Sequence, residues 1–162
     1  MKNFDLEHDQ NIDIAFMQEA LLEARKALAK DESPIGCVIV KDGQIIGRGH
    51  NTTETDDLAL SHAEINAIKQ ASQKMGWRLE GTSMYITMEP CAMCAGAIVR
   101  SRIDRVIIGL RDPKRGCAGS RYNLLNEPAF NHQAQVSYDI LSQESLDLLQ
   151  SFFREKRQRS KT

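Results

Sequence analysis

Apolar positions recur with helical spacing in the first half of the chain. In residues 16–30 they follow one another at intervals of three or four, which is the period of one face of an α-helix. Pro34 ends this helix, because a proline disfavours the helical conformation of the residue before it. A second helix is predicted at residues 61–76, with Ser61 as its N-cap and Gly76 as its stop. Further helices are expected at residues 91–101 and 142–158.

Short apolar runs without that spacing mark the strands. Residues 35–40 and 44–50 are two such runs, and the Asp42-Gly43 pair between them is typical of a hairpin turn. Further strands are expected at residues 83–88, 105–110 and 135–140, and a loop with short helical pieces is expected at 111–135, which is rich in Gly, Pro and Asn. Because strands and helices alternate through the middle of the chain, we predict an α/β protein with a mixed five-stranded sheet and helices on both faces.

The length of 162 residues and the hydrophobic content of 41% suit one globular domain. We expect this domain at residues 12–158, a mobile segment at 1–11 and a basic tail at 159–162. No apolar run approaches the ~20 residues of a membrane span, and the polar, acidic N-terminus is unlike a signal or transit peptide. These features predict a cytoplasmic protein without membrane contact, in which the four cysteines stay reduced.

Positive charge is confined to two segments, although the net charge of the chain is −1. Residues 100–121 and 151–162 together hold twelve Lys or Arg and three Asp or Glu, a net charge of +9, whereas the remainder carries −10. This distribution is typical of a face that binds a polyanion. A solvated loop and a solvated basic tail are the alternative explanation.

The four cysteines fall into two groups. Cys37 lies inside a strand and Cys117 in the loop, and we expect both to pack as small hydrophobic residues. Cys91 and Cys94 share the first turn of a predicted helix directly after a strand and Pro90. Free N–H groups and the helix dipole lower the pKa of a thiol at that point, so the pair is suited to redox chemistry or to metal binding.

A third metal ligand is available in the segment SHAEINAI. His62 opens the helix at 61–76, and Glu64 follows two residues later. A structural zinc takes four protein ligands, whereas a catalytic zinc takes three and leaves a position for water. H-A-E followed 29 residues later by P-C-x-x-C matches the signature of the zinc nucleobase deaminases, in which the glutamate transfers protons. Positions two apart on a straight helix differ by about 200° in direction, so the pattern does not explain how His62 and Glu64 reach one centre.

Longer segments extend this match. PIGCVIVKDGQIIGRGHN, SHAEINAI, YITMEPCAMCAGAIVRSRIDRVIIGLRDPKRGCAGS and FNHQ resemble, in this order, the bacterial tRNA-specific adenosine deaminases of the cytidine deaminase-like superfamily. The resemblance covers residues 12–158. The narrower assignment, to the tRNA-specific enzymes within the superfamily, rests on residues 109–120 and on FFR at 152–154. It implies a three-layer α/β/α cytidine deaminase-like fold, a homodimer with one Zn²⁺ per chain, and conversion of the wobble adenosine of a tRNA anticodon to inosine.

The resemblance also implies roles for ten residues. The zinc ligands are His62, Cys91 and Cys94, and the proton shuttle is Glu64. Substrate contacts are implied for Asn51 at the target nucleoside, for Asp112 and Asn131 at the anticodon-loop nucleotides, and for Phe152, Phe153 and Arg154 on the last helix. Helix packing is the alternative for the two phenylalanines. The chain departs from the family pattern at Cys117, where a small apolar residue is usual, and at Pro113, which follows Asp112 in the loop expected to read RNA.

Three other functions compete with tRNA editing. A deaminase of a free base or nucleoside, such as guanine, cytosine or cytidine, would use the same zinc site, but it needs no basic last helix bearing phenylalanines. A nucleic-acid-binding module with structural zinc leaves Glu64 without a role. A redox protein leaves both His62 and Glu64 without one.

Overall fold

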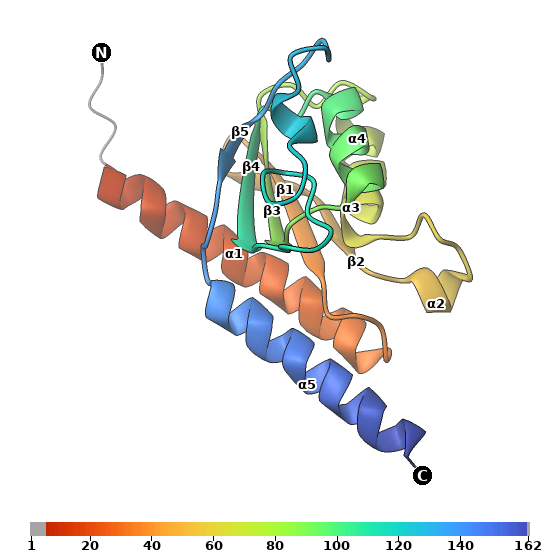
Figure 1. Cartoon of the computed structure of the whole chain (residues 1–162). Coiled ribbons are helices and arrows are strands. Elements are labelled where there is room, and N and C mark those ends of the chain that lie inside the picture. The colour runs from red at the N-terminus through yellow and green to blue at the C-terminus, as the bar shows by residue number, and fades with distance from the viewer. Residues whose placement is uncertain (1–5, 162) are drawn as a thin grey trace.

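The computed structural model describes the backbone of residues 6–161 and contains one five-stranded sheet with helices packed against it (Figure 1). The elements follow one another as α1 (Leu6–Ala29), β1 (Gly36–Lys41), β2 (Gln44–His50), α2 (Thr53–Asp56), α3 (Ala63–Met75), β3 (Thr82–Met88), α4 (Ala92–Ser101), β4 (Arg105–Leu110), the 3-10 helix η1 (Leu124–Asn126), β5 (Gln135–Ser137) and α5 (Ser142–Ser160).

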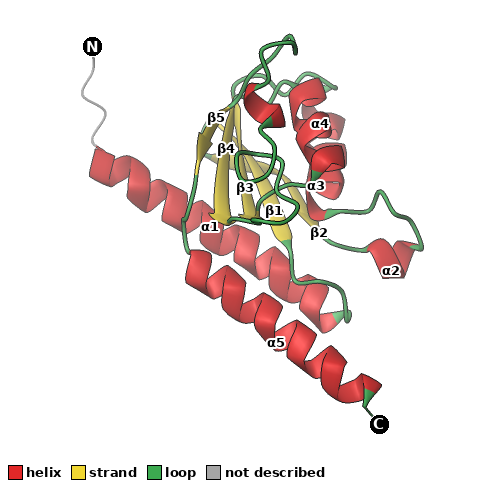
Figure 2. Cartoon of the chain, in the orientation of Figure 1, coloured by secondary structure: helices red, strands yellow, loops and turns green. Residues whose placement is uncertain are grey.

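The strands lie in the order β2-β1-β3-β4-β5, and the sheet is mixed as predicted (Figure 2). β1 runs antiparallel to β2 and to β3, whereas β3, β4 and β5 are parallel to one another. Because β3 and β4 are parallel, their carboxyl ends meet at the same edge of the sheet. The segments that follow them, Glu89–Cys91 and the loop after Leu110, therefore begin side by side.

Helices cover both faces of the sheet, which confirms the three-layer α/β/α fold. Helices α1 and α5 lie together on one face, and α3 and α4 lie on the other (Figure 1). Alternate residues of β1 are buried on opposite faces. Ile39 packs with Ala67 of α3 and Ile98 of α4, whereas Val38 packs with Met17 of α1.

Two glycines on β2 allow α3 to lie directly on the sheet. A Cβ atom at Gly49 would collide with the backbone of Ala63 and Ala67, and one at Gly47 would collide with the backbone of Ala67. The absence of these side chains brings the first turn of α3 down onto the strand. This contact sets the position of the residues at the start of α3.

Three larger differences from the prediction are observed. Helix α1 begins at Leu6, so residues 6–11 are helical, while residues 1–5 of the segment expected to be mobile lie outside the described part of the chain. Strand β5 ends at Ser137, not at residue 140, because Asp139 and Leu141 have positive φ angles of 66° and 55° that turn the chain. The short helix α2 was not predicted.

The domain limits 12–158 stay a prediction, and helices α1 and α5 extend beyond both of them. Among residues 6–161 there is no helix with both the length and the apolar character that a membrane crossing requires.

Candidate active site

Three ligand atoms from distant parts of the chain meet at the carboxyl edge of the sheet. The Nδ1 atom of His62 lies 3.6 Å from the Sγ atom of Cys91 and 3.5 Å from that of Cys94. All three ligand atoms lie within 4.8 Å of one another, and they form the one such group found among the described residues. The structure therefore brings together the three predicted metal ligands.

The spacing of these atoms fits a tetrahedral zinc ion. With Zn–S bonds of about 2.3 Å and a Zn–N bond of about 2.0 Å, tetrahedral angles place sulfur and nitrogen about 3.5 Å apart. The two sulfur–nitrogen distances agree with this value. Two thiolates and one imidazole are a usual zinc ligand set, and three ligands leave the fourth position for water.

Two of the three ligands are the N-cap residues of helices. His62 precedes α3 with extended backbone angles (φ −76°, ψ 157°), and Cys91 precedes α4 in the same way (φ −75°, ψ 178°). His62, not Ser61 as predicted, is therefore the N-cap of α3. Both helices point their free N–H groups toward the site, which favours thiolate at Cys91 and Cys94.

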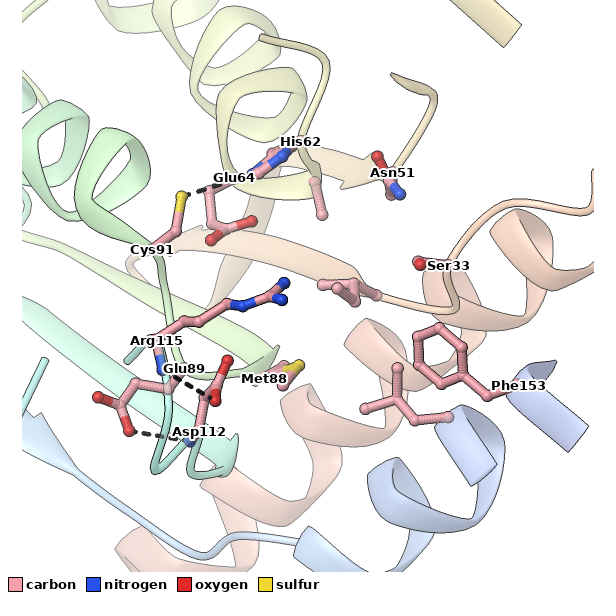
Figure 3. Close-up of a pocket in the computed structure, with 13 residues that line it drawn as sticks. Ser33, Asn51, His62, Glu64, Met88, Glu89, Cys91, Asp112, Arg115 and Phe153 are labelled. Carbon is pink, nitrogen blue, oxygen red and sulfur yellow. Dashed lines mark hydrogen bonds between the residues drawn. The ribbon is translucent and has the colours of Figure 1, made fainter. Parts of the chain in front are cut away.

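The N-cap position of His62 also explains how Glu64 reaches the site. Because His62 lies outside the helix, the angular spacing of helical residues does not separate it from Glu64. The Glu64 side chain extends into the cavity beside Cys91 (Figure 3). Glu64 is only 4% exposed, and burial raises the pKa of its carboxyl to about 7. A carboxyl with this pKa can both accept and release a proton near neutral pH.

The pKa values of the two thiols of the site are shifted in opposite directions. A hydrogen bond from Cys94 and a second one from His62 lower the pKa of Cys91 to about 4. The hydrogen bond to Cys91 and burial raise the pKa of Cys94. The hydrogen bond between Cys91 and His62 also raises the pKa of His62.

A cavity of about 310 Å³ opens above this group and is large enough for one nucleoside. Asn51, Asp112 and Phe153, three of the six predicted substrate contacts, lie in its wall (Figure 3). The Oδ1 atom of Asn51 accepts hydrogen bonds from the backbone N–H and the hydroxyl of Thr53 (3.2 and 2.7 Å). The Asn51 amide is thereby oriented, and its nitrogen donates to no other described residue.

The other three predicted substrate contacts lie outside the cavity wall. Asn131 accepts a hydrogen bond from Arg102 (2.9 Å), and Arg154 is exposed on α5. Phe152 is 2% exposed and meets the Phe153 ring edge-on at 5.3 Å. Burial of Phe152 favours the packing alternative for this residue, whereas Phe153, which is 47% exposed, faces the cavity.

Glu89 was not predicted from the sequence. Its side chain is 5% exposed and accepts hydrogen bonds from the backbone N–H groups of Asp112 (3.2 Å), Ala118 (3.1 Å) and Ser120 (3.1 Å), and from the Ser120 hydroxyl (2.5 Å). A Cβ atom at Gly116 would collide with this carboxylate. Glu89 therefore holds the loop 112–120 against the metal site. The signal available in the sequence was its place between a buried strand and Pro90.

Six further residues of the cavity wall were also not predicted as site residues, namely Ser33, Ile35, Ala63, Met88, Arg115 and Leu149. The two remaining cysteines lie outside the ligand group. Cys37 is fully buried in the sheet, and Cys117 is 5% exposed, with its thiol directed to the Arg115 carbonyl (3.4 Å). The expectation that both pack as small hydrophobic residues is confirmed.

Comparison with known sequences agrees with the geometry. Residues 10–110 match the family described as the cytidine and deoxycytidylate deaminase zinc-binding region. The tRNA-specific adenosine deaminase of Bacillus subtilis (strain 168) is 49% identical over 150 residues, which cover 92% of this chain and 93% of the relative. That of Streptococcus pyogenes serotype M18 is 50% identical over 147 residues, covering 90% of this chain and 92% of the relative.

Solved structures have the same architecture. One, from a study of A-to-I editing by tRNA:A34 deaminases at the wobble position of transfer RNA, has a TM-score of 0.80 at 41% identity and covers 83% of this chain and 99% of that chain. A guanine deaminase from Nitrosomonas europaea has a TM-score of 0.75 at 21% identity, covering 86% of this chain and 83% of that chain. The second likeness concerns the fold alone.

Proposed function

Because the chain belongs to the cytidine and deoxycytidylate deaminase family, and within it to the tRNA-specific adenosine deaminases, we propose that it deaminates the wobble adenosine of a tRNA anticodon to inosine. It is a zinc-dependent hydrolase, and His62, Cys91 and Cys94 hold the metal. The observation that carries the chemistry is the buried Glu64 carboxyl beside these three ligands.

A zinc ion held by His62, Cys91 and Cys94 would lower the pKa of a water at its open position from 15.7 to about 7. Glu64 takes a proton from this water as the oxygen adds to C6 of adenine, and passes it to N1 of the ring. Glu64 then carries the second proton of the water to the amino group, which leaves as ammonia, and a carbonyl remains at C6. Asn51 orients the nucleoside through its amide, and the apolar wall at Ile35 and Leu149 limits the access of bulk water.

A polymeric substrate is favoured by a second hollow that adjoins the cavity. It has a volume of about 610 Å³ and shares Met88, Asp112, Leu149 and Phe153 with the first cavity. Both basic segments contribute to its wall, through Arg111 after β4 and through Arg157 on α5. A free base occupies only the inner cavity, whereas an anticodon loop extends past it toward these cations.

The test is incubation of the protein with an anticodon stem-loop that carries a wobble adenosine, with inosine read by sequencing. Free adenosine, guanine and cytidine are the parallel substrates. Conversion of the stem-loop alone supports the proposal. Conversion of a free base or nucleoside, with none of the stem-loop, would show a small-molecule deaminase with the same zinc site.

The proposal includes a cytoplasmic homodimer with one zinc per chain. Leu58 and Leu60, which are 43% and 52% exposed, give the segment between α2 and α3 an apolar surface that a second copy could cover. Sedimentation of the zinc-loaded protein tests the assembly, because a species of single-chain mass at micromolar concentration contradicts it. Fractionation of cells that express the protein tests the location.

A further inference from the structure

Of the residues that the structure describes, Arg115 is the one lysine or arginine in the wall of the cavity. Its side chain extends from the loop after β4 into the cavity, between Glu64 on one side and Met88 on the other (Figure 3). Arg115 is exposed, and among the described residues its guanidinium has no hydrogen-bond or ion-pair partner. An unpaired guanidinium that points into an active site is available to a substrate.

The loop itself aims Arg115. The Oδ1 atom of Asp112 accepts hydrogen bonds from the backbone N–H groups of Lys114 and Arg115, both at 3.1 Å. Glu89 in turn accepts from the N–H of Asp112 and from Ser120, and so holds the two ends of the loop. The backbone at Arg115 is therefore fixed from two sides, and only its side chain is free to move.

The neighbouring carboxylates do not neutralise this arginine. Asp112 and Glu89 direct oxygen atoms to backbone N–H groups of the loop, and neither has an ion pair with Arg115. Glu64 forms no ion pair with it either. A guanidinium presents several N–H donors in a planar fork that matches two phosphate oxygens, and such charge-assisted pairs are stronger than neutral hydrogen bonds.

We propose that Arg115 binds a phosphate group that flanks the target nucleoside, and that it thereby makes the enzyme prefer a nucleotide within a chain to a free nucleoside. A neutral base or nucleoside offers this cation no partner, whereas every internal nucleotide carries a phosphate on each side. The inference rests on the proposed function and identifies the residue that distinguishes a polynucleotide from a small molecule at the same zinc site.

The first measurement compares Arg115→Gln, Arg115→Lys and Arg100→Gln, each loaded with zinc, on the stem-loop with a wobble adenosine. Arg100 is exposed on α4, about 13 Å along the helix from Cys91, so its variant removes the same charge away from the cavity. We expect Arg115→Gln to lower kcat/KM on the stem-loop roughly 10- to 100-fold, mostly through KM, because one charge-assisted contact is lost. Arg115→Lys should lose less, and Arg100→Gln should match the unchanged protein.

The second measurement asks whether phosphate is the partner. A stem-loop with one uncharged methylphosphonate linkage, on the 5′ or the 3′ side of the target adenosine, should bind the unchanged protein roughly 10-fold more weakly at one of the two positions. The same linkage should have no further effect on Arg115→Gln, because both changes remove one contact. Arg115→Gln should also reduce the slope of log affinity against log salt by roughly 0.7 to 0.9.

The outcomes separate this inference from the function on which it rests. If the unchanged protein edits the stem-loop and Arg115→Gln edits it with the same KM and salt slope, the inference is wrong and the function stands. If the effects of the linkage and of Arg115→Gln add in full, Arg115 does not contact that phosphate, and the inference is also wrong. If the unchanged protein does not edit any stem-loop, the proposed function fails and the inference fails with it.

Discussion

The Nδ1 atom of His62 and the Sγ atom of Cys94 lie 3.5 Å apart, although 32 residues separate them in the chain. This proximity results from two helices, α3 and α4, that begin at the same edge of the sheet and present their first turns to each other. The metal site is therefore a property of the packed fold, and its ligands are presented by backbone that the sheet holds in place.

Removal of one thiol should abolish zinc binding. We expect Cys91→Ala to retain much less than one zinc per chain after dialysis, because two protein ligands do not hold a catalytic zinc tightly. Cys117→Ala is the matched control, since it also removes one thiol, yet Cys117 lies outside the ligand group. The zinc content of both variants is measured by mass spectrometry. Full zinc in Cys91→Ala, or loss of zinc in Cys117→Ala, would overturn the ligand assignment.

Glu64→Gln should separate chemistry from metal binding. The amide keeps the size of the side chain but cannot carry protons, so turnover of the stem-loop should fall by at least ~10² to 10⁴-fold. Zinc content should stay at one per chain, because Glu64 is not a ligand in this arrangement. Single-turnover rates with metal analysis of the same sample test this expectation. Near-normal rates with zinc present would mean that Glu64 does not transfer the protons.

Most of the helices and strands could be predicted from the local sequence. Strands buried on both faces are short apolar runs, and the helices end at turn residues. The position of Glu64 relative to His62 could not be predicted in this way, because it depends on where α3 begins. His62 is the N-cap, so its side chain does not follow the angular spacing of the helical residues. The role of Glu89 could not be predicted either, because its place before Pro90 does not indicate its partners, Asp112 to Ser120, which lie 23 to 31 residues away.

The phenylalanines of the last helix show the same limit. Neighbouring positions on a helix differ by about 100° in direction, so only one of Phe152 and Phe153 can face the core. The composition of the helix does not say which one, because both side chains are alike. Packing of α5 against the sheet decides it, and Phe152 is the buried one.

The loop that carries Asp112 and Arg115 should depend on Glu89. Glu89→Ala leaves the buried N–H of Ala118 and other loop donors without their acceptor, so the free energy of unfolding should fall by about 2 to 3 kcal/mol. Glu80→Ala removes an exposed carboxylate that pairs with Arg78, and it should change this free energy by no more than about 0.5 kcal/mol. Urea denaturation of the zinc-loaded proteins measures both. Equal stability of the two variants would show that Glu89 does not hold the loop.

Phe152→Ala and Phe153→Ala should have opposite effects, and each serves as the control for the other. Phe152 is buried, so its truncation should lower the free energy of unfolding by about 3 to 5 kcal/mol. Phe153→Ala should cost less than about 1 kcal/mol of stability but should weaken binding of the stem-loop by about 1 to 3 kcal/mol, because an exposed ring at the cavity wall can stack on a base. Denaturation and binding curves at one salt concentration distinguish the two. A large loss of stability in Phe153→Ala, with weaker binding of the stem-loop in Phe152→Ala, would mean that Phe153 is the packing residue and Phe152 the RNA contact.

The end of α5 separates RNA editing from small-molecule deamination. Arg157 lines the second hollow beside the cavity, and Arg154 is exposed on the same helix. Arg159, in contrast, pairs with Asp31 through two hydrogen bonds of 3.1 and 2.7 Å. If Arg154 and Arg157 contact phosphates, their joint replacement by glutamine should reduce the slope of log affinity against log salt by roughly 1.4 to 1.8, since each lost contact removes roughly 0.7 to 0.9.

Zinc content and stability should not change in this double variant, because both side chains are exposed and α5 carries none of the three ligands. The matched control is Arg78→Gln with Arg100→Gln, which removes the same two charges from other parts of the surface. Binding of the stem-loop across a range of salt concentrations measures the slopes. A slope that falls equally in both double variants would indicate a long-range effect of net charge. An unchanged slope in the α5 variant would mean that this helix does not touch RNA, and the preference for tRNA would then have to arise at the cavity itself.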